Sequence, residues 1–179
     1  MRLGRDEPFP REIDLVVIGG GPGGASAGLA AARLGLRVLL LEQTRFPRHK
    51  LGETLPPKVL PILSFLGVLP EVEAAGFVRM NGNTNLLGAT PVAQVFAPGG
   101  HAYGFQVERD RFDEILLAAA EREGVCVAEE ASVSRPLLAR DNSRHVTGVV
   151  VRRPGRGAEA LLAPFVIDAS GPSCLLARA

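Results

Sequence analysis

The stretch from Asp14 to Glu42, DLVVIGGGPGGASAGLAAARLGLRVLLLE, decides the fold. Leu15–Ile18 is a short apolar run rich in β-branched residues, which predicts a parallel strand buried on both faces. Three closely spaced glycines then predict a turn, and a helix of small residues runs until about Gly35. Val38–Leu41 predicts a second strand. This order predicts a βαβ unit in a Rossmann-like parallel sheet, and hence an α/β fold.

The glycine turn has the G-x-G-x-x-G spacing of dinucleotide-binding proteins. Gly19 permits the tight turn, Gly21 lets the backbone approach a pyrophosphate, and Gly24 lets the helix pack closely on the strand. The N–H groups and the positive dipole end at the start of the helix attract phosphate. A glycine-rich turn without a ligand is the alternative, and the strand, helix and acidic residue in register argue against it.

Glu42 closes the second strand, where a carboxylate can accept both ribose hydroxyls of an adenosine. A glutamate, in place of an arginine that binds a 2′-phosphate, argues against NADP. It does not separate NAD from FAD.

The whole-chain numbers describe an ordinary globular protein of 179 residues, with 46% hydrophobic and 22% charged residues and a formal net charge of +1. The arginines are scattered, so no nucleic-acid surface is predicted. Cys126 and Cys174 form no C-x-x-C pair, which predicts neither a disulfide framework nor a metal site. No signal peptide or membrane segment is recognisable, and we expect a cytoplasmic protein.

The middle of the chain begins with a predicted loop, Gln43–Leu55, which is rich in basic residues. It could reach a pyrophosphate or a flavin edge, or it could be a solvated connection, and the residues alone favour neither. Thr54 is a candidate cap for a helix that Pro61 should kink or delay and that ends at Gly67. Glu71–Gly76 predicts a short helical turn.

Loose alternation then predicts antiparallel strands, and they are followed by the clearest amphipathic helix, Asp110–Glu123, with Asp110 as its cap and Gly124 at its end. A further parallel strand, Val125–Ala128, should lie beside the first two. The predicted antiparallel strands are Phe77–Met80, Thr84–Leu87, Val92–Ala97 and Tyr103–Val107, with a turn at Pro98-Gly99-Gly100.

The last third of the chain predicts a three-stranded antiparallel β meander of Ser132–Leu138, His145–Arg152 and Glu159–Ile167. Its final residues, Phe165–Ile167, run into Asp168-Ala169-Ser170-Gly171 and should return beside the opening strand. We expect a structural role for His145, since no partner base or ligand accompanies it in the sequence.

Four motifs together resemble the FAD-dependent monooxygenases of the glutathione-reductase fold, and more closely the branch with flavin-dependent halogenases and geranylgeranyl reductases. They are the glycine turn with Glu42, the loop FPRHKLGETLPP, VERDRFD at Val107–Asp113, and VIDASG at Val166–Gly171. The second is similar to that branch's F-P-R-x-x-x-G-E-S/T signature and is the most specific. The resemblance implies FAD as the cofactor.

The resemblance also implies where FAD would lie. The glycine turn would hold the pyrophosphate, Glu42 the ribose and Val133 the adenine through its backbone, and Asp168 and Gly171 would complete the turn near the phosphates. Arg48, Gly52, Glu53 and Thr54 would line the flavin side, and Arg109 would approach the cofactor from the start of its helix. Arg109 could instead pair locally, and Asp168 could cap a final helix. No residue is a convincing catalytic acid or base, and Glu53 is a weak candidate. The implied cofactor-binding residues are Gly19, Gly21, Pro22, Gly23, Gly24, Glu42, Gln43, Arg48, Gly52, Glu53, Thr54, Arg109, Val133, Asp168 and Gly171.

One departure from the halogenase pattern concerns a lysine in a G-F-x-x-K-x-G motif, which handles the oxidised halogen in that branch. Here Gly76–Gly82 reads GFVRMNG, so Met80 occupies the lysine position. A thioether cannot replace an amine as a donor or nucleophile. Arg79 should point to the other face of a strand. Hydroxylation is therefore ranked above halogenation.

A second departure is length, because family members continue into a second flavin-binding G-D segment and, in halogenases, a W-x-W-x-I-P motif. Neither occurs here, and the chain has no tryptophan. We expect residues 1–179 to form a single, incomplete FAD-binding domain of a truncated glutathione-reductase-type fold, with 77–107 belonging to an inserted substrate-domain segment.

The resulting expectation is an FAD-dependent monooxygenase that hydroxylates an organic small molecule through a flavin hydroperoxide, with NAD(P)H or a flavin reductase as electron donor. The alternatives are a halogenase, a geranylgeranyl-reductase-like enzyme, and a non-catalytic nucleotide-binding fragment or half of a split enzyme. Nucleic-acid partners are not expected.

Overall fold

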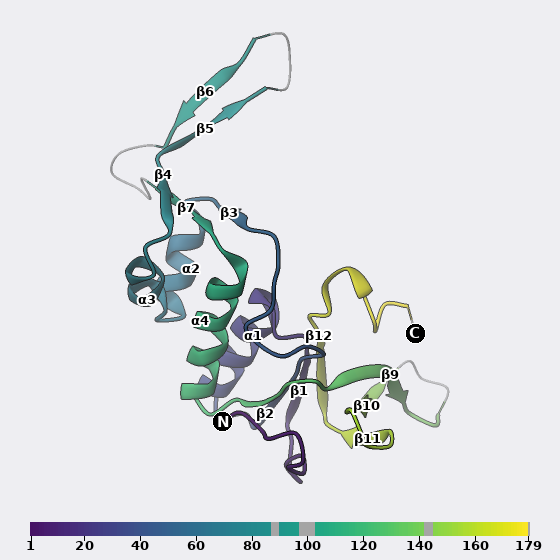
Figure 1. Ribbon diagram of the computed structural model, residues 1–179. Helices are drawn as coiled ribbons and strands as arrows, with labels where there is room; N and C mark the ends of the chain where they lie inside the picture. The colour runs from purple at the N-terminus through teal and green to yellow at the C-terminus, as the bar shows by residue number, and fades with distance from the viewer. Residues whose placement is uncertain (87–89, 97–102, 142–144, 179) are drawn as a thin grey trace. The chain divides into compact units, whose positions relative to one another are not determined.

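The computed structural model describes every residue except 87–89, 97–102, 142–144 and 179 (Figure 1). Two compact units divide the chain. The first contains Met1–Arg48 and Leu116–Ala179, and the second contains His49–Ile115. That residues 77–107 belong to a substrate domain stays a prediction, and the described ones all lie in the second unit.

The first unit contains the predicted parallel sheet, with strand order β12-β1-β2-β8. Strand β1 (Leu15–Ile18) is followed by helix α1 (Pro22–Arg33) and by β2 (Val38–Leu41), which pairs with β1 in parallel. β8 (Cys126–Ala128) pairs with β2, and β12 (Phe165–Asp168) pairs with β1. The predicted βαβ unit and the return of the last strand beside the first are confirmed.

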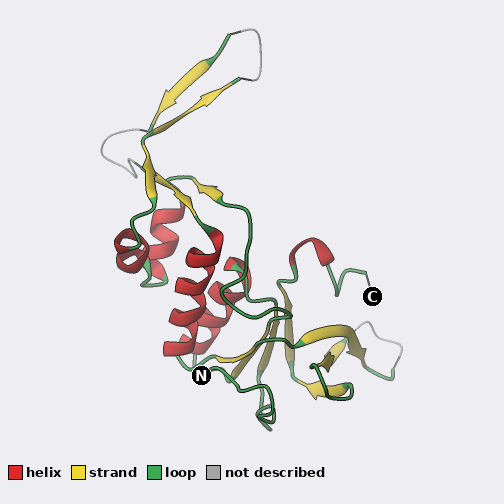
Figure 2. Ribbon diagram, viewed as in Figure 1, coloured by secondary structure: helices red, strands yellow, loops and turns green. Residues whose placement is uncertain are grey.

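All eight residues of β1 and β2 are buried, as a parallel sheet covered on both faces requires. Helix α1 packs on these two strands (Figure 2). On the other face, Val16, Leu39 and Val149 belong to one hydrophobic cluster that joins the parallel sheet to the meander. α1 ends at Arg33 with Leu34 as its C-cap, and the next residue, Gly35, is left-handed with φ of 82°, a conformation that suits the position after a helix C-cap.

The meander consists of β9 (Ser132–Leu138), β10 (Val146–Arg152) and β11 (Glu159–Leu162), in the order β11-β10-β9. The prediction of one strand over Glu159–Ile167 is wrong, because the chain changes sheets at Pro164. Ala163 donates its N–H to Thr147 of the meander, Pro164 has no N–H to donate, and Phe165 donates to Asp14 before β1.

Residues at the N-terminus extend the parallel sheet beyond β8. Val127 donates its N–H to the Met1 carbonyl at 2.8 Å, and Leu3 donates to the Val127 carbonyl at 2.8 Å. Arg2 forms an isolated parallel bridge with Val127. These bonds pair backbone groups that the edge of β8 would otherwise present to water.

The second unit contains a three-stranded antiparallel sheet, β3-β7-β4, formed by β3 (Glu53–Leu55), β7 (Gly104–Val107) and β4 (Val78–Met80). Strands β5 (Gly82–Asn85) and β6 (Val92–Val95) form a separate antiparallel pair. The helices are α2 (Val59–Phe65), α3 (Leu69–Ala74) and the start of α4 (Arg109–Arg122), which continues into the first unit.

Two local predictions in this unit are wrong. The loop Gln43–Leu55 ends in strand β3, so Thr54 pairs with Gln106 of β7 and does not cap a helix. α2 begins at Val59 after Lys58, and no side chain caps it. Asp110 is not the cap of α4, because it lies inside the first turn of that helix, where its carboxylate accepts the Arg111 N–H.

The four predicted antiparallel strands are present as β4, β5, β6 and β7. Three of them are shorter than predicted, whereas β5 begins two residues earlier, at Gly82, and ends at Asn85. Residues 87 and 97 and the predicted turn at 98–100 lie outside the described residues. Within the described part of the chain, no helix combines the length and apolarity needed to cross a bilayer.

Candidate functional site

The backbone around the glycine turn leaves no room for side chains at Gly19 and Gly24, as the glycine spacing predicts. Gly19 has φ of 101°, and a Cβ atom there would lie 2.4 Å from the carbonyl oxygen of Ala169. A Cβ atom on Gly24 would lie 1.8 Å from the carbonyl oxygen of Gly19. Gly19 therefore allows the turn after β12 to approach the glycine turn, and Gly24 allows α1 to pack closely against the end of β1.

The start of α1 suits an anionic group. Gly21 is the N-cap and supplies no side chain, Pro22 follows in the first turn, and that turn contains no acidic residue. Gly23 is exposed, and a Cβ atom there would meet no atom within 4 Å. The helix therefore presents main-chain N–H groups of its first turn to an approaching phosphate without a competing carboxylate.

Glu42 is 5% exposed and held by main-chain and side-chain donors. One carboxylate oxygen, Oε2, accepts the Gly20 N–H at 2.8 Å. The other, Oε1, accepts the Thr44 N–H at 2.9 Å and the Thr44 hydroxyl at 2.7 Å. Each oxygen can accept two hydrogen bonds, so Oε2 retains capacity for a ribose hydroxyl. These bonds also fix the carboxylate beside the glycine turn.

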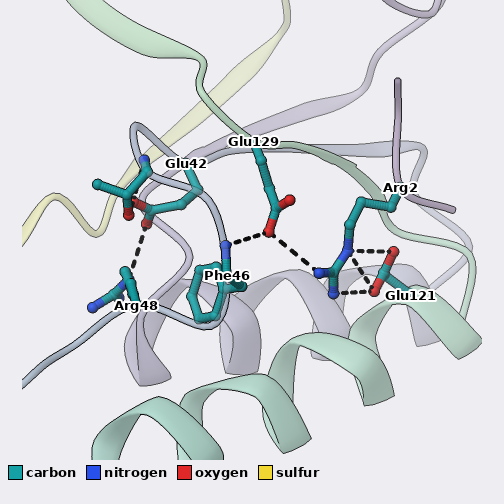
Figure 3. A network of polar contacts seen from close by, with 7 residues as sticks. Arg2, Glu42, Phe46, Arg48, Glu121 and Glu129 are labelled. Carbon is teal, nitrogen blue, oxygen red and sulfur yellow. Dashed lines mark hydrogen bonds and ion pairs between the residues drawn. The ribbon is translucent and has the colours of Figure 1, made fainter. Parts of the chain in front are cut away.

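Arg48 brings a positive charge next to this carboxylate. Its Nε lies 3.8 Å from Oε2 of Glu42, and its guanidinium lies 4.8 Å from the ring centre of Phe46 (Figure 3). The Arg48 side chain is 12% exposed. Gln43 is exposed on the same loop. The sequence-predicted Glu42 and Arg48 are thus brought together in the first unit.

Asp168 is the last residue of β12, and Gly171 follows the turn residues Ala169 and Ser170, which lie against Gly19. Burial raises the pKa of Asp168, but hydrogen bonds from Ser170 and from the Leu176 N–H lower it by more than burial raises it. The pKa of Asp168 therefore lies below its usual range. The Ser170 and Leu176 N–H groups donate to the two carboxylate oxygens at 3.0 and 2.8 Å. Asp168 therefore holds the backbone of the turn that follows it, and its role toward FAD stays a prediction. The alternative, a cap on the final helix, is wrong, because the helical turn there has Ser170 at its N-cap and no side-chain cap. Gly171, with φ of 66°, begins the 3-10 turn η1 (Gly171–Ser173).

The second unit holds four further predicted residues, which are Gly52, Glu53, Thr54 and Arg109. Arg109 donates to Glu53 at 2.6 Å and to both carboxylate oxygens of Asp113, at 2.7 and 3.1 Å. Asp113 is completely buried. The hydrogen bond with Asp113 raises the pKa of Arg109. Three nitrogens of Arg109 donate to carboxylates. Arg109 thus forms the local pairing that was the alternative to its predicted approach to the cofactor.

Val133 lies in β9 opposite Val151, and its role toward an adenine stays a prediction. Sequence reasoning missed Thr44, although its position two residues after Glu42 is typical of a side chain that bonds to nearby backbone. It also missed Asp113 as the main partner of Arg109. Their spacing of four residues on a helix could have revealed that pair.

The fold and the turn define a dinucleotide-binding domain of the Rossmann class. Residues 12–178 match the family described as FAD binding domain, and the chain belongs to that family. FAD is the cofactor that this match indicates. The glycine turn, in which Cβ atoms on Gly19 and Gly24 would clash with backbone, suits the pyrophosphate of FAD. The buried Glu42 suits its ribose.

The chain is similar to several flavin-dependent halogenases. It is 36% identical to a tryptophan 2-halogenase of Chondromyces crocatus over 94% of this chain and 32% of that protein. It is 30% identical to a 1H-pyrrole-2-carbonyl-[peptidyl-carrier protein] brominase of Pseudoalteromonas luteoviolacea, over 94% of this chain and 40% of that protein. The structure of the myxobacterial chondrochloren halogenase CndH superposes with a TM-score of 0.83 and 38% identity, covering 92% of this chain and 38% of that one. The chain thus spans about a third of the length of the curated relatives it matches.

Proposed function

We propose that this chain is the FAD-binding part of a flavin-dependent halogenase. The observation that carries the proposal is the 36% identity to a tryptophan 2-halogenase across 94% of the chain, together with a glycine turn built for a dinucleotide. The similarity to a halogenase ranks halogenation above hydroxylation, whereas the sequence analysis favoured hydroxylation.

The chain's own residues would bind and orient the cofactor. The first-turn N–H groups of α1 would hold the pyrophosphate, and Glu42 would hold the adenosine ribose through Oε2. Arg48 would supply positive charge near that ribose. FAD, when bound, supplies the redox chemistry with O₂.

The substrate would be an electron-rich aromatic ring. The two relatives described above act, by their names, on tryptophan and on a pyrrole group attached to a carrier protein. Indole and pyrrole are both electron-rich heteroaromatic rings, which suits attack on an oxidised halogen. The electron donor would be NAD(P)H or a separate flavin reductase.

A second candidate function is hydroxylation, and Met80 favours it. Met80 pairs with Gly104 across β4 and β7, and its methyl group lies 3.3 Å from the position that a Gly104 Cβ would take. Arg79 does not substitute for a lysine here, because its guanidinium lies over the Tyr103 ring at 4.5 Å and pairs with Glu73 at 3.2 Å. These contacts agree with the prediction that Arg79 faces away from Met80.

The test is product analysis with the full-length protein, FAD, a flavin reductase, NADH, ¹⁸O₂, bromide and a panel of indoles and pyrroles. Products with the bromine isotope pattern support halogenation. Products that gain only ¹⁸O support hydroxylation and overturn the halogenase proposal. The variant Met80→Lys is the matched comparison, and we expect it to raise any bromination at least about tenfold, about 1.4 kcal/mol in the barrier.

A further inference from the structure

The N-terminal residues are connected to the ribose-binding loop by side chains that are far apart in the sequence. Arg2 donates from Nη1 to Oε1 of Glu129 at 3.2 Å. The same guanidinium is held by Glu121 of α4, with the shortest of three contacts at 2.6 Å (Figure 3). Both glutamates are largely buried, at 13% and 18% side-chain exposure.

Glu129 links Arg2 to the loop that follows Glu42. Its Oε1, the oxygen that Arg2 contacts, also accepts the Phe46 N–H at 2.8 Å. Phe46 is 6% exposed, and its ring carries the Arg48 guanidinium. The loop from Glu42 to Arg48 is thus held at its start by Gly20 and in its middle by Glu129.

The backbone on either side of Glu129 holds Glu42 as well. Glu42 donates its N–H to the Ala128 carbonyl, and Ala131 donates to the Glu42 carbonyl, both at 2.9 Å. Glu130 between them has φ of 53°, an uncommon conformation for a residue other than glycine. A turn fixed in this way directs the Glu129 side chain to Phe46, and the bridge of Arg2 with Val127 brings the arginine to it.

We infer that Arg2 and Glu129 are positioning residues for the adenosine half of FAD. Neither is among the residues assigned above to FAD itself. Glu129 accepts the Phe46 N–H, and the ion pair with Arg2 holds the largely buried Glu129 carboxylate in position to do so. Without this support the loop that bears Glu42 and Arg48 loses the bond in its middle, and the ribose site becomes less well ordered. The inference rests on FAD as the cofactor and does not depend on halogenation.

The test measures FAD affinity by quenching of flavin fluorescence, with ADP as a competitor, for wild type, Arg2→Met, Arg2→Lys, Glu129→Ala and Glu129→Gln. Arg33→Met is the matched control, because Arg33 also pairs with a glutamate, Glu123, at 3.0 Å, and it lies at the end of α1 opposite to the glycine turn. Binding is measured well below each variant's own melting temperature, so that all the protein is folded.

We expect Arg2→Met and Glu129→Ala to weaken FAD and ADP by the same factor, about tenfold. Arg2→Lys should recover most of the loss, because it restores the charge. Glu129→Gln should lose less than Glu129→Ala, because its amide oxygen still accepts the Phe46 N–H. Arg33→Met should match wild type.

Unchanged FAD affinity in Arg2→Met, with only a lower melting temperature, would overturn the inference and leave Arg2 a purely structural role. A loss of FAD affinity without a loss of ADP affinity would overturn it too, since the effect would then lie outside the adenosine half. If wild type bound no FAD, the FAD assignment itself would fail, a result distinct from equal binding by wild type and variant.

Discussion

Glu42 and Glu53 are two glutamates that the sequence assigns to the cofactor, and the two units hold them differently. Glu42 is buried and accepts main-chain N–H groups of Gly20 and Thr44. Glu53 is 53% exposed at its side chain and is held by one side chain, that of Arg109. A carboxylate bound to main chain is placed by the path of the chain, whereas one bound to a side chain depends on how that partner is held. Here the partner is itself held by the buried Asp113.

The largest effect should come from closing the glycine turn with Gly24→Ala. The new Cβ would lie 1.8 Å from a carbonyl oxygen, so the backbone of α1 or β1 must move. We expect a loss of about 3 kcal/mol in the free energy of unfolding and at least about a hundredfold weaker FAD binding. Urea denaturation and flavin titration measure the two losses.

The control for Gly24→Ala is Gly23→Ala, one residue earlier. A Cβ at this position meets nothing within 4 Å, and alanine favours a helix by up to about 1 kcal/mol over glycine. Gly23→Ala should therefore fold at least as well as wild type. Equal destabilisation by the two variants would contradict the role assigned to Gly24.

In the second unit, Asp113→Asn should have the largest effect. The amide keeps the shape of the completely buried carboxylate but leaves the Arg109 charge without its main partner. Removing one member of a buried ion pair costs about 3 kcal/mol, and urea denaturation measures it. Glu108→Gln is the control, because Glu108, the residue before α4, is exposed and pairs with Arg111 of that helix, where about 0.5 kcal/mol is expected. A loss in Asp113→Asn no larger than in this control would refute the importance of the pair.

These two units also differ in how well the sequence predicts them. The β1–α1–β2 segment was predicted because its glycine spacing, its apolar runs and its acidic end are all local. Strand β3 was not, because its first two residues are exposed and its identity comes from pairing with β7, where Glu53 lies opposite Val107. No periodicity within a short exposed segment encodes such a partner.

The same limit applies to the candidate site. Glu42 was found from its distance to the glycines, and Asp168 from its strand-to-turn motif. The contact of Arg2 with Glu129 spans 127 positions and depends on the N-terminal bridge to β8, which no local pattern indicates. Sequence reasoning therefore identifies the groups placed by backbone geometry and misses those placed by distant side chains.

A smaller effect, and one that depends on pH, should follow Asp168→Asn in the first unit. Hydrogen bonds hold the pKa of Asp168 below its unfolded value, so the folded protein binds fewer protons than the unfolded chain. Its contribution to stability is therefore full above the unfolded pKa, near 4, and is lost as pH falls through the lower folded pKa. We expect Asp168→Asn to cost about 1 to 2 kcal/mol at pH 7.

The measurement is urea denaturation of wild type and Asp168→Asn from pH 7 down to the lowest pH at which both still fold. The difference between them should stay constant to about pH 5 and then shrink, because the wild-type carboxyl group becomes protonated. A difference that grows on acidification would have the wrong sign and would contradict the role of the charged form.

The smallest effect tests the opening comparison directly, with Glu53→Gln set against Glu42→Gln. A half-exposed ion pair contributes at most about 1 kcal/mol, so Glu53→Gln should change the free energy of unfolding by less than that. Glu42→Gln replaces one acceptor oxygen of a buried carboxylate with a donor, facing the N–H of either Gly20 or Thr44. It should cost about 2 kcal/mol and weaken FAD binding. Parallel denaturation of both variants gives the ratio of the two losses. Equal losses would show that main-chain donors hold a carboxylate no more firmly than the Arg109 side chain does.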